Sequence, residues 1–487
     1  MPFSENIKKI LLPRIDTIGD LVLLEPFLTA LQEVFKGANI SLLVREGYEQ
    51  LAPLFPDQLQ WRVLGVNPYS RPIDPSVVRD LLSQLENEHW DLVLFTKYEH
   101  TWLEYLIGAW FKGVQKVAIS PMEEFPEWLT PYLRRLGRDS EFPCNDLVSV
   151  EEIIHESDKY QILINYVVGE KKRLPSPKLT VPNVSKNNSL EILQSLRLSD
   201  KIFCVCLPGG TENIAIKKWP SEKFAKVIAW LKRKYKIDTL LIGHEKEREI
   251  VEEVAGLART RSGQPPIWLG KDGDIPLLAG ILERAKFYLG NDTGPMHMSA
   301  ALGIPVVALF GGGTWPRFIP KGSESHVVVR PMPCFYCGWK CSFMDAPCIK
   351  DLPLSLVQEA LEIVVEKDEP NKNEISIHEA EPYPEITKKF IEKAGVTFRE
   401  SEADREARLK VIYGCEWRIQ EIEADRAARL EVIEGLGKRL EESEADRAAR
   451  LGVIREQIKL IEVQRAELIK SSLMWKMAGP FNRPLKK

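Results

Sequence analysis

The loop at residues 16–20 carries carboxylates where an apolar run, residues 9–15, gives way to a helical pattern. Apolar side chains recur at helical spacing from Leu21 to Leu31. Because Asp20 follows a glycine at this junction, we expect its carboxylate at the helix N-terminus, facing the predicted cleft, where it could take part in chemistry. The same position suits an N-cap or first-turn residue that stabilises the helix by about 1 kcal/mol. The residues alone leave both roles open.

A second loop offers groups that bind phosphate. Gly210 and Thr211 follow the apolar run at residues 201–207, and Lys217 comes a few positions later. Backbone N–H groups and a hydroxyl can donate to phosphate oxygens, and the lysine supplies countercharge. We expect Trp219, which comes next, to pack in the core.

A third loop follows the apolar run at residues 287–290. Asp292, Thr293 and Gly294 precede Pro295, a residue that suits the first position of a helix. A helix N-terminus with a hydroxyl donor is a site for a diphosphate. His297, one turn further, is either a ligand of the same site or a satisfied core histidine.

Alternating strands and helices must position these loops. The first half has apolar runs at 9–15, 39–44, 61–64, 91–96 and 116–119, and the second at 201–207, 238–243, 287–290 and 305–310. Continuous apolar strands separated by helices predict parallel sheets covered on both faces. We therefore predict an α/β protein with two Rossmann-like domains, an interdomain cleft that binds ligands, and a C-terminal long helix or coiled coil. Neither half shows G-x-G-x-x-G after its first strand, and no P-loop occurs, which disfavours dehydrogenases and P-loop NTPases.

Composition shifts divide the chain further, with a polar stretch at 174–189 as the interdomain linker. The predicted parts are an N-terminal Rossmann-like acceptor domain (1–180), a C-terminal Rossmann-like donor domain (190–365), an acidic, proline-punctuated linker (366–400), a coiled-coil repeat (401–470) and a basic aromatic tail (471–487).

The repeat has a period of 21 residues. The segment 402–409 recurs at 423–430 and again at 444–451. Because 21 residues are three heptads, the pattern predicts a left-handed coiled coil and hence a homo-oligomer. Glycines at 435, 437 and 452 weaken the helix by about 1 kcal/mol each. The alternative is a single long helix that lies back on its own catalytic domains.

Four cysteines crowd into fifteen residues: Cys334, Cys337, Cys341 and Cys348. Four thiolates at short spacing can bind one structural zinc ion. Free or conditionally paired thiols are an equal alternative, and an iron–sulfur cluster is a third.

The bulk composition excludes some classes of function. A net charge of −4 gives no sign of nucleic-acid binding. No stretch approaches the roughly 18 apolar residues of a membrane span, and the first residues lack a secretory pattern, so we expect a cytoplasmic protein. The tail interleaves basic and aromatic residues, which suits the inner face of the cytoplasmic membrane. A solvated tail, or one packed on a neighbouring protomer, is the alternative.

In their order and spacing, the three loops resemble those of the ADP-heptose:lipopolysaccharide heptosyltransferases, glycosyltransferase family nine. The resemblance covers about residues 8–360, and the third loop with its continuation to Gly311 is its most specific part. It implies inverting transfer, a GT-B fold and no cofactor for catalysis. It further implies Asp20 as the general base, with donor contacts from Gly210, Thr211, Lys217, Glu245 (to the ribose), Asp292, Thr293, Gly294 and His297.

The sequence thus predicts an inverting glycosyltransferase that moves a sugar from a nucleotide-diphosphate donor to a hydroxyl of a cell-surface glycan or lipopolysaccharide-type acceptor. Heptose, and ADP-heptose as donor, follow from the resemblance alone. The alternative is a non-catalytic scaffold with a glycosyltransferase-like fold that is assembled by its coiled coil. A sugar-nucleotide epimerase ranks third, because the dinucleotide fingerprint is missing.

Overall fold

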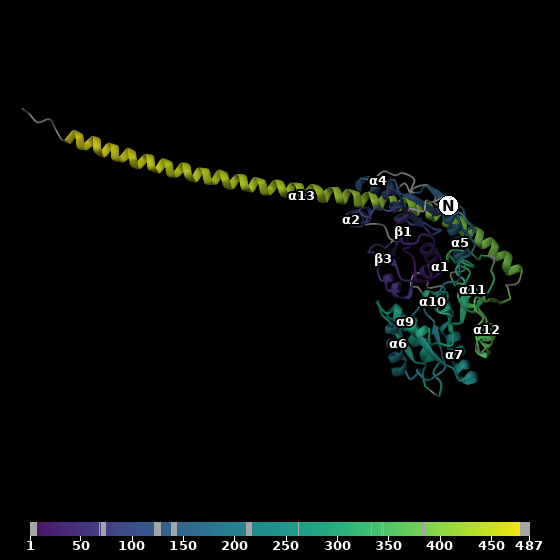
Figure 1. Ribbon diagram of the computed structural model, residues 1–487. Helices are drawn as coiled ribbons and strands as arrows, with labels where there is room; N and C mark the ends of the chain where they lie inside the picture. The colour runs from purple at the N-terminus through teal and green to yellow at the C-terminus, as the bar shows by residue number, and fades with distance from the viewer. Residues whose placement is uncertain are drawn as a thin grey trace, which may run out of the picture. The chain divides into compact units, whose positions relative to one another are not determined.

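A computed structural model describes residues 7–67, 69, 75–120, 128–137, 144–210, 217–261, 263–332, 334–341, 343, 345–367, 369–381 and 385–477. The chain divides into two compact units, residues 1–405 and 406–487. The first unit contains two parallel sheets with helices around them (Figure 1).

The first sheet has six parallel strands in the order β3-β2-β1-β4-β5-β6. They are β1 (Lys9–Pro13), β2 (Asn39–Arg45), β3 (Leu59–Leu64), β4 (Leu92–Phe95), β5 (Gln115–Ile119) and β6 (Asp146–Val148). This is the order of the dinucleotide-binding Rossmann fold, in which the chain changes direction between β1 and β4. Loops that follow these two strands therefore lie next to each other at one edge of the sheet.

The second sheet repeats the arrangement with seven parallel strands, in the order β13-β12-β11-β10-β7-β8-β9. They are β7 (Phe203–Leu207), β8 (Asp238–His244), β9 (Ile267–Gly270), β10 (Tyr288–Asn291), β11 (Val306–Phe310), β12 (Ser325–Val329) and β13 (Ile375–Glu379). Here the change of direction falls between β7 and β10. Strands such as β7 and β11 are buried at every residue because helices cover both faces. The predicted fold class is confirmed.

Twelve helices besides the C-terminal one are described. They are α1 (Ile18–Val34), α2 (Pro75–Glu86), α3 (Trp102–Trp110), α4 (Leu129–Arg135), α5 (Glu156–Val168), α6 (Asn183–Ser195), α7 (Ser221–Tyr235), α8 (Arg248–Leu257), α9 (Ile275–Leu282), α10 (Gly294–Ala301), α11 (Pro347–Lys350) and α12 (Leu354–Glu366). α1 begins at a capping box, in which the backbone N–H of Thr17 donates to the Asp20 carboxylate at 3.1 Å.

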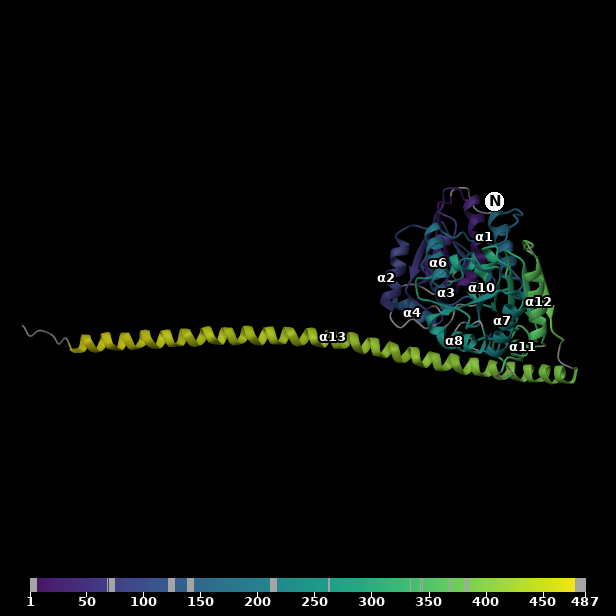
Figure 2. The ribbon, with the colours of Figure 1, turned by 90° about the horizontal axis from the view of Figure 1, so that it is seen from below.

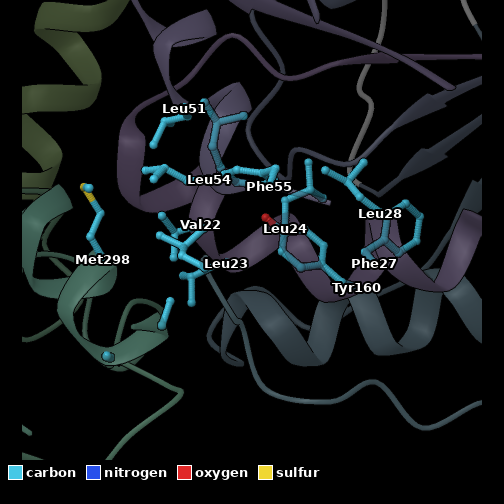
Figure 3. Close-up of a cluster of buried hydrophobic side chains, with 14 of the residues drawn as sticks. Val22, Leu23, Leu24, Phe27, Leu28, Leu51, Leu54, Phe55, Tyr160 and Met298 are labelled. Carbon is cyan, nitrogen blue, oxygen red and sulfur yellow. The ribbon is translucent and has the colours of Figure 1, made fainter. Parts of the chain in front are cut away.

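The two sheets meet where α1 and α10 begin. A Cβ atom built on Gly19 would lie 2.6 Å from the His297 ring, and one built on Gly294 would lie 2.9 Å from Ile18. Both glycines are therefore required for this close approach. Behind the contact, one apolar cluster runs from α1 through Tyr160 of α5 to Met298 of α10 (Figure 3). The packed core thus fixes the two helix starts against each other.

Two segments predicted as linkers contain regular structure. Within the polar stretch at 174–189, α6 begins at Asn183. Within the stretch at 366–400, β13 pairs with β12 and the C-terminal helix begins at Glu385. β13 is an edge strand whose exposure alternates residue by residue, so it lacks the continuous apolar run by which strands such as β1 and β7 were predicted.

The C-terminal helix, α13, runs from Glu385 to Met477 as one continuous element (Figure 2). From residue 421 to residue 470 almost every side chain is exposed. The long helix is confirmed, whereas pairing of this helix is not tested by a single chain. Within the described part of the chain, no helix is both long enough and apolar enough to cross a membrane. The basic tail lies outside the described residues beyond Met477, and no side chain after Lys470 is described.

Candidate active site

The loop after β1 gathers a buried cluster of charges. The guanidinium of Arg14, only 1% exposed, lies 3.1 Å from both Asp16 and Asp20. A single buried cation therefore holds the two carboxylates in place at the carboxyl end of the central strand.

Asp20 occupies the capping position at the start of α1, and its role as the base stays a prediction. One oxygen accepts from Arg14, and the other accepts from the backbone N–H and the hydroxyl of Thr17, the hydroxyl at 2.7 Å. Burial raises the pKa of Asp20, the negative charge of Asp16 adds to this effect, and Arg14 opposes it. A carboxylate with a raised pKa is a stronger base than an exposed one. The capping role is thus present, and it places a basic carboxylate where α1 meets α10.

Lys97 is a member of this cluster that the sequence analysis missed. It comes just after β4, and its ammonium lies 2.8 Å from Asp16, which also accepts from the Tyr69 hydroxyl. Burial works against the charge on Asp16, but Lys97 and then Arg14 outweigh it and hold its pKa below the usual range. The signal in the sequence was a lysine directly after a buried strand, beside the change of direction in the sheet.

Glu156, at the start of α5, joins the two halves of the unit. Its carboxylate is 1% exposed and lies 2.9 Å from Lys159, 2.8 Å from Arg317 and 4.0 Å from Arg14. Arg317 comes from the loop after β11 in the second sheet, and its backbone carbonyl accepts from the Glu156 N–H at 3.0 Å. Burial opposes the charge on Glu156, but Arg317, Lys159 and Arg14 together lower its pKa. The ion pair therefore ties the second sheet to the loop that carries Asp20.

The glycine loop after β7 is fixed by two residues outside the predicted set. The side-chain amide of Asn291, which is fully buried, donates to the carbonyls of Pro208 and Gly209 at 3.0 and 2.9 Å. A carboxylate oxygen of Glu247 accepts from the Gly210 N–H at 2.7 Å. The predicted phosphate donor Gly210 is therefore paired with a carboxylate, and Thr211 lies outside the described residues.

Glu245, the predicted ribose ligand, does not join this loop. Its side chain is 43% exposed and pairs with Arg248 at 2.7 Å, whereas Glu247, two residues later, contacts the loop. The turn Glu245–Glu247 follows β8, and the carboxylates of its first and last residues point in different directions. The spacing in the sequence does not show which of these two glutamates contacts the glycine loop.

The start of α10 gathers the remaining predicted donor residues. Asp292 lies 3.7 Å from the ammonium of Lys217, and the Thr293 hydroxyl is bonded to the Tyr288 hydroxyl at 3.1 Å. A methyl group of Thr293 lies 3.9 Å from the Cβ position of Gly210. The glycine loop, Lys217 and the start of α10 thus lie together, because they follow the neighbouring strands β7 and β10.

His297 is buried at this junction, 3% exposed, and its Nδ1 atom has no hydrogen-bond partner within the described part of the chain. Burial lowers its pKa to about 4, so the ring is neutral at pH 7. A neutral imidazole with an unpartnered nitrogen can donate or accept one hydrogen bond. It lies against Gly19, the residue before Asp20, so it borders both the acceptor-side and the donor-side loops.

The cysteine cluster lies behind the loop after β11. The four cysteines line a narrow apolar cavity of about 20 Å³ together with Phe335 and Trp339. Burial raises the pKa of Cys348 to about 12 and also raises that of Cys337. Among the described residues, no group of three His, Cys, Asp or Glu side chains is placed to hold a metal ion. The arrangement therefore lends no support to the predicted zinc.

Part of the chain is similar to a described family. The model of glycosyltransferase family 9 (heptosyltransferase) matches residues 151–341. The lipooligosaccharide heptosyltransferase 2 of Campylobacter jejuni is 28% identical over 157 residues, 31% of this chain and 48% of that protein. The chain therefore spans about half the length of the curated relatives it matches in this way.

Solved structures extend the likeness across both sheets. A family 9 glycosyl transferase from Veillonella parvula superposes with a TM-score of 0.61 at 18% identity, and the match covers 75% of this chain and 98% of that one. The ADP-heptose LPS heptosyltransferase II of E. coli gives a TM-score of 0.55 at 18% identity, and the match covers 73% and 98%. These superpositions show a common fold, and the sequence matches support a glycosyltransferase.

Proposed function

We propose that the chain is an inverting glycosyltransferase that moves a sugar from a nucleoside diphosphate to an acceptor hydroxyl of a lipopolysaccharide-type glycan. The observation that carries this proposal is the meeting of the Asp20 loop with the start of α10. This close approach supports the proposal, because Asp20 would act as the base on one side and the start of α10 would bind an anion on the other. The resemblance to family 9 makes ADP-heptose the first donor to test.

The chemistry follows from the two sides of this junction. Asp20 takes the proton of the acceptor hydroxyl, whose oxygen bonds to the anomeric carbon while the bond from that carbon to the diphosphate oxygen breaks. The leaving nucleoside diphosphate gains negative charge, which Lys217, the N–H groups at the start of α10 and the Thr293 hydroxyl stabilise. Attack opposite the leaving group inverts the anomeric centre, and no cofactor takes part in this sequence.

The donor site needs two adjustments to the predicted set. Glu247 holds the Gly210 N–H and replaces Glu245 as the carboxylate beside the glycine loop. The unpartnered Nδ1 of His297 supplies a hydrogen bond to the sugar or to a phosphate oxygen. Lys97, Arg14 and Asp16 form the acceptor-side wall next to Asp20.

The test is transfer of heptose from ADP-heptose to a lipopolysaccharide core acceptor, with Asp20→Asn as the variant. The substitution keeps the shape of the side chain, and we expect turnover to fall by roughly 10² to 10⁴-fold with donor affinity nearly unchanged. Thr29→Val on the same helix is the matched control and should retain full turnover, because its hydroxyl bonds only to Glu25. Turnover of Asp20→Asn within a few-fold of the parent chain would remove Asp20 from the role of base.

A non-catalytic scaffold is the second candidate. It is favoured by three contacts, since Thr17 and Arg14 occupy both Asp20 oxygens and Glu247 occupies the Gly210 N–H. Binding of ADP separates the candidates, because a ligand at a hundred times its dissociation constant stabilises the folded state by about 2.7 kcal/mol. A melting temperature that ADP and GDP leave unchanged at millimolar concentration favours the scaffold.

We further propose that α13 associates with a second copy of the chain and that the basic aromatic tail contacts the inner face of the cytoplasmic membrane. The 21-residue period supports association, because it keeps one face of the helix toward a partner. The pairing of basic with aromatic residues in the tail supports the membrane contact. Association would gather several tails, so that weak membrane contacts add through effective concentration.

A further inference from the structure

We propose that the exposed part of α13 pairs with the same segment of a second chain in antiparallel orientation, in the register that sets Glu423 against Arg447 and Arg426 against Glu444. The inference rests on the self-association proposed above and on no step of sugar transfer. It names the partner, the orientation and the register of that association.

A row of large apolar side chains on α13 has no cover in the single chain. Each member of the row is between 48% and 62% exposed. The members are Ile419, Leu430, Ile433, Leu440, Leu451, Ile454, Ile458 and Ile461. A row of this length on one helix is the pattern of a protein interface rather than of scattered surface residues.

These residues fall on one seam of the helix, spaced alternately by three and four positions. Between residues 419 and 461 the seam also contains five residues that are charged or lack a side chain: Glu423, Arg426, Gly437, Glu444 and Arg447. In heptad terms the glutamates occupy a positions and the arginines occupy d positions. Each 21-residue repeat therefore puts one Glu and one Arg in the seam, and the apolar residues fill most of the rest.

The charges in the seam discriminate between the two orientations. In a parallel pair, a positions meet a positions and d positions meet d positions, so Glu would face Glu and Arg would face Arg at four layers. A shift by one whole repeat leaves these like-charge layers unchanged. In an antiparallel pair, a positions meet d positions, so each Glu can face an Arg. Polar residues at seam positions are known to select the register and partner of coiled coils.

One antiparallel register satisfies both repeats at once. In this register, two residues lie opposite each other when their numbers add up to 870. Residue 423 thus meets residue 447 of the second chain, and residue 426 meets residue 444. Between residues 419 and 451 the apolar layers then coincide as well, because Leu430 meets Leu440 and Ile419 meets Leu451. The four seam charges within these residues are paired, and each pair occurs twice by symmetry.

The centre of this register falls on the glycines of the helix. Gly437 faces Ile433 of the second chain, and nothing lies within 4 Å of the Cβ positions of Gly435 and Gly437 in the single chain. Glycine weakens a helix interior, but at the centre of a pair it admits the larger side chain of the partner. At the edge of the seam, Glu434 approaches Glu441 of the second chain. This like-charge contact is exposed, so salt screens its repulsion.

The test uses charge exchange within the full chain, followed by sedimentation velocity over a range of concentrations. The first variant is Glu423→Arg with Arg426→Glu. In the proposed register, this variant places Arg opposite Arg and Glu opposite Glu of the second chain. We expect its dimer dissociation constant to rise at least about 100-fold. The combined variant adds Glu444→Arg and Arg447→Glu, which restores every pair, and its dissociation constant should return to within about threefold of the parent value.

The matched control exchanges Lys438 and Glu442, which lie on the side of the helix away from the seam and should leave the dissociation constant unchanged. A parallel pair would show no loss in the first variant and no rescue in the second, and this result overturns the proposal. So does a monomer at every concentration, which also removes the self-association. Heptose transfer is assayed on the same samples, and loss of transfer in a well-formed antiparallel dimer would count against the proposed function alone.

Discussion

Replacing Arg317 with alanine should destabilise the first unit far more than an ordinary ion pair would suggest. The guanidinium is 8% exposed and lies 2.8 Å from the carboxylate of Glu156, which is 1% exposed. It also lies over the rings of Tyr98 and Phe318. The substitution removes all of these contacts at the joint between the two sheets.

The size of the effect follows from the charge that is left behind. Breaking a buried pair by removing one partner typically costs about 3–5 kcal/mol, because the remaining charge is buried without compensation. Here Lys159 stays 2.9 Å from Glu156 and compensates in part. We therefore expect a loss of about 3 kcal/mol in the free energy of unfolding, at the lower end of that range.

The assay is urea denaturation at pH 7, followed by tryptophan fluorescence. Lys321→Ala is the matched control, because Lys321 also pairs across the same joint, 3.2 Å from Asp158, but with 25% and 59% exposure. An exposed pair of this kind contributes about 0–1 kcal/mol. If Arg317→Ala and Lys321→Ala lower the free energy of unfolding equally, the buried pair of Arg317 with Glu156 does not hold the two sheets together.

Three further outcomes are expected. The pKa of Glu156 is lowered, so its ion pairs stabilise the fold at pH values above the ordinary pKa of a glutamate, and this contribution is lost as the pH falls through the lowered pKa. The denaturation midpoints of Arg317→Ala should therefore converge on those of the parent chain as the pH falls. Lys217→Ala should weaken ADP binding by about 1.5–3 kcal/mol in a calorimetric titration, and unchanged affinity would contradict the donor site. Elemental analysis of protein purified without added metal should show one zinc per chain if the four cysteines bind it, whereas four titratable thiols and no zinc would favour free thiols.

The sequence was sufficient to predict the fold class because the buried strands are continuous apolar runs. The sequence also predicts that the three loops carry the site, since each loop directly follows such a strand, and this stays a prediction. Strand order was not predictable from the runs themselves, and it is strand order that places Lys97 beside Asp16. The edge strand β13 was missed because only alternate residues are partly covered.

Individual contacts were harder to predict than the positions of the loops. Glu245 and Glu247 are two residues apart in one turn, and only the backbone path after β8 decides which carboxylate reaches Gly210. Arg317 and Glu156 are 161 residues apart in the sequence. Their pairing depends on how the two sheets pack, which a pattern within one segment does not contain.

The two sheets share one strand order but carry opposite chemistry where the chain changes direction. In the first sheet this place holds the carboxylates of Asp16 and Asp20, and in the second it holds Lys217 and the positive end of α10. Because Gly19 and Gly294 let the two helix starts touch, the proposed base and the proposed anion site lie next to each other. A side chain at either glycine would separate the base from the leaving-group site without altering any charged residue. Gly19→Ala should therefore impair transfer while ADP binding persists, because a methyl group there meets the His297 ring rather than the glycine loop.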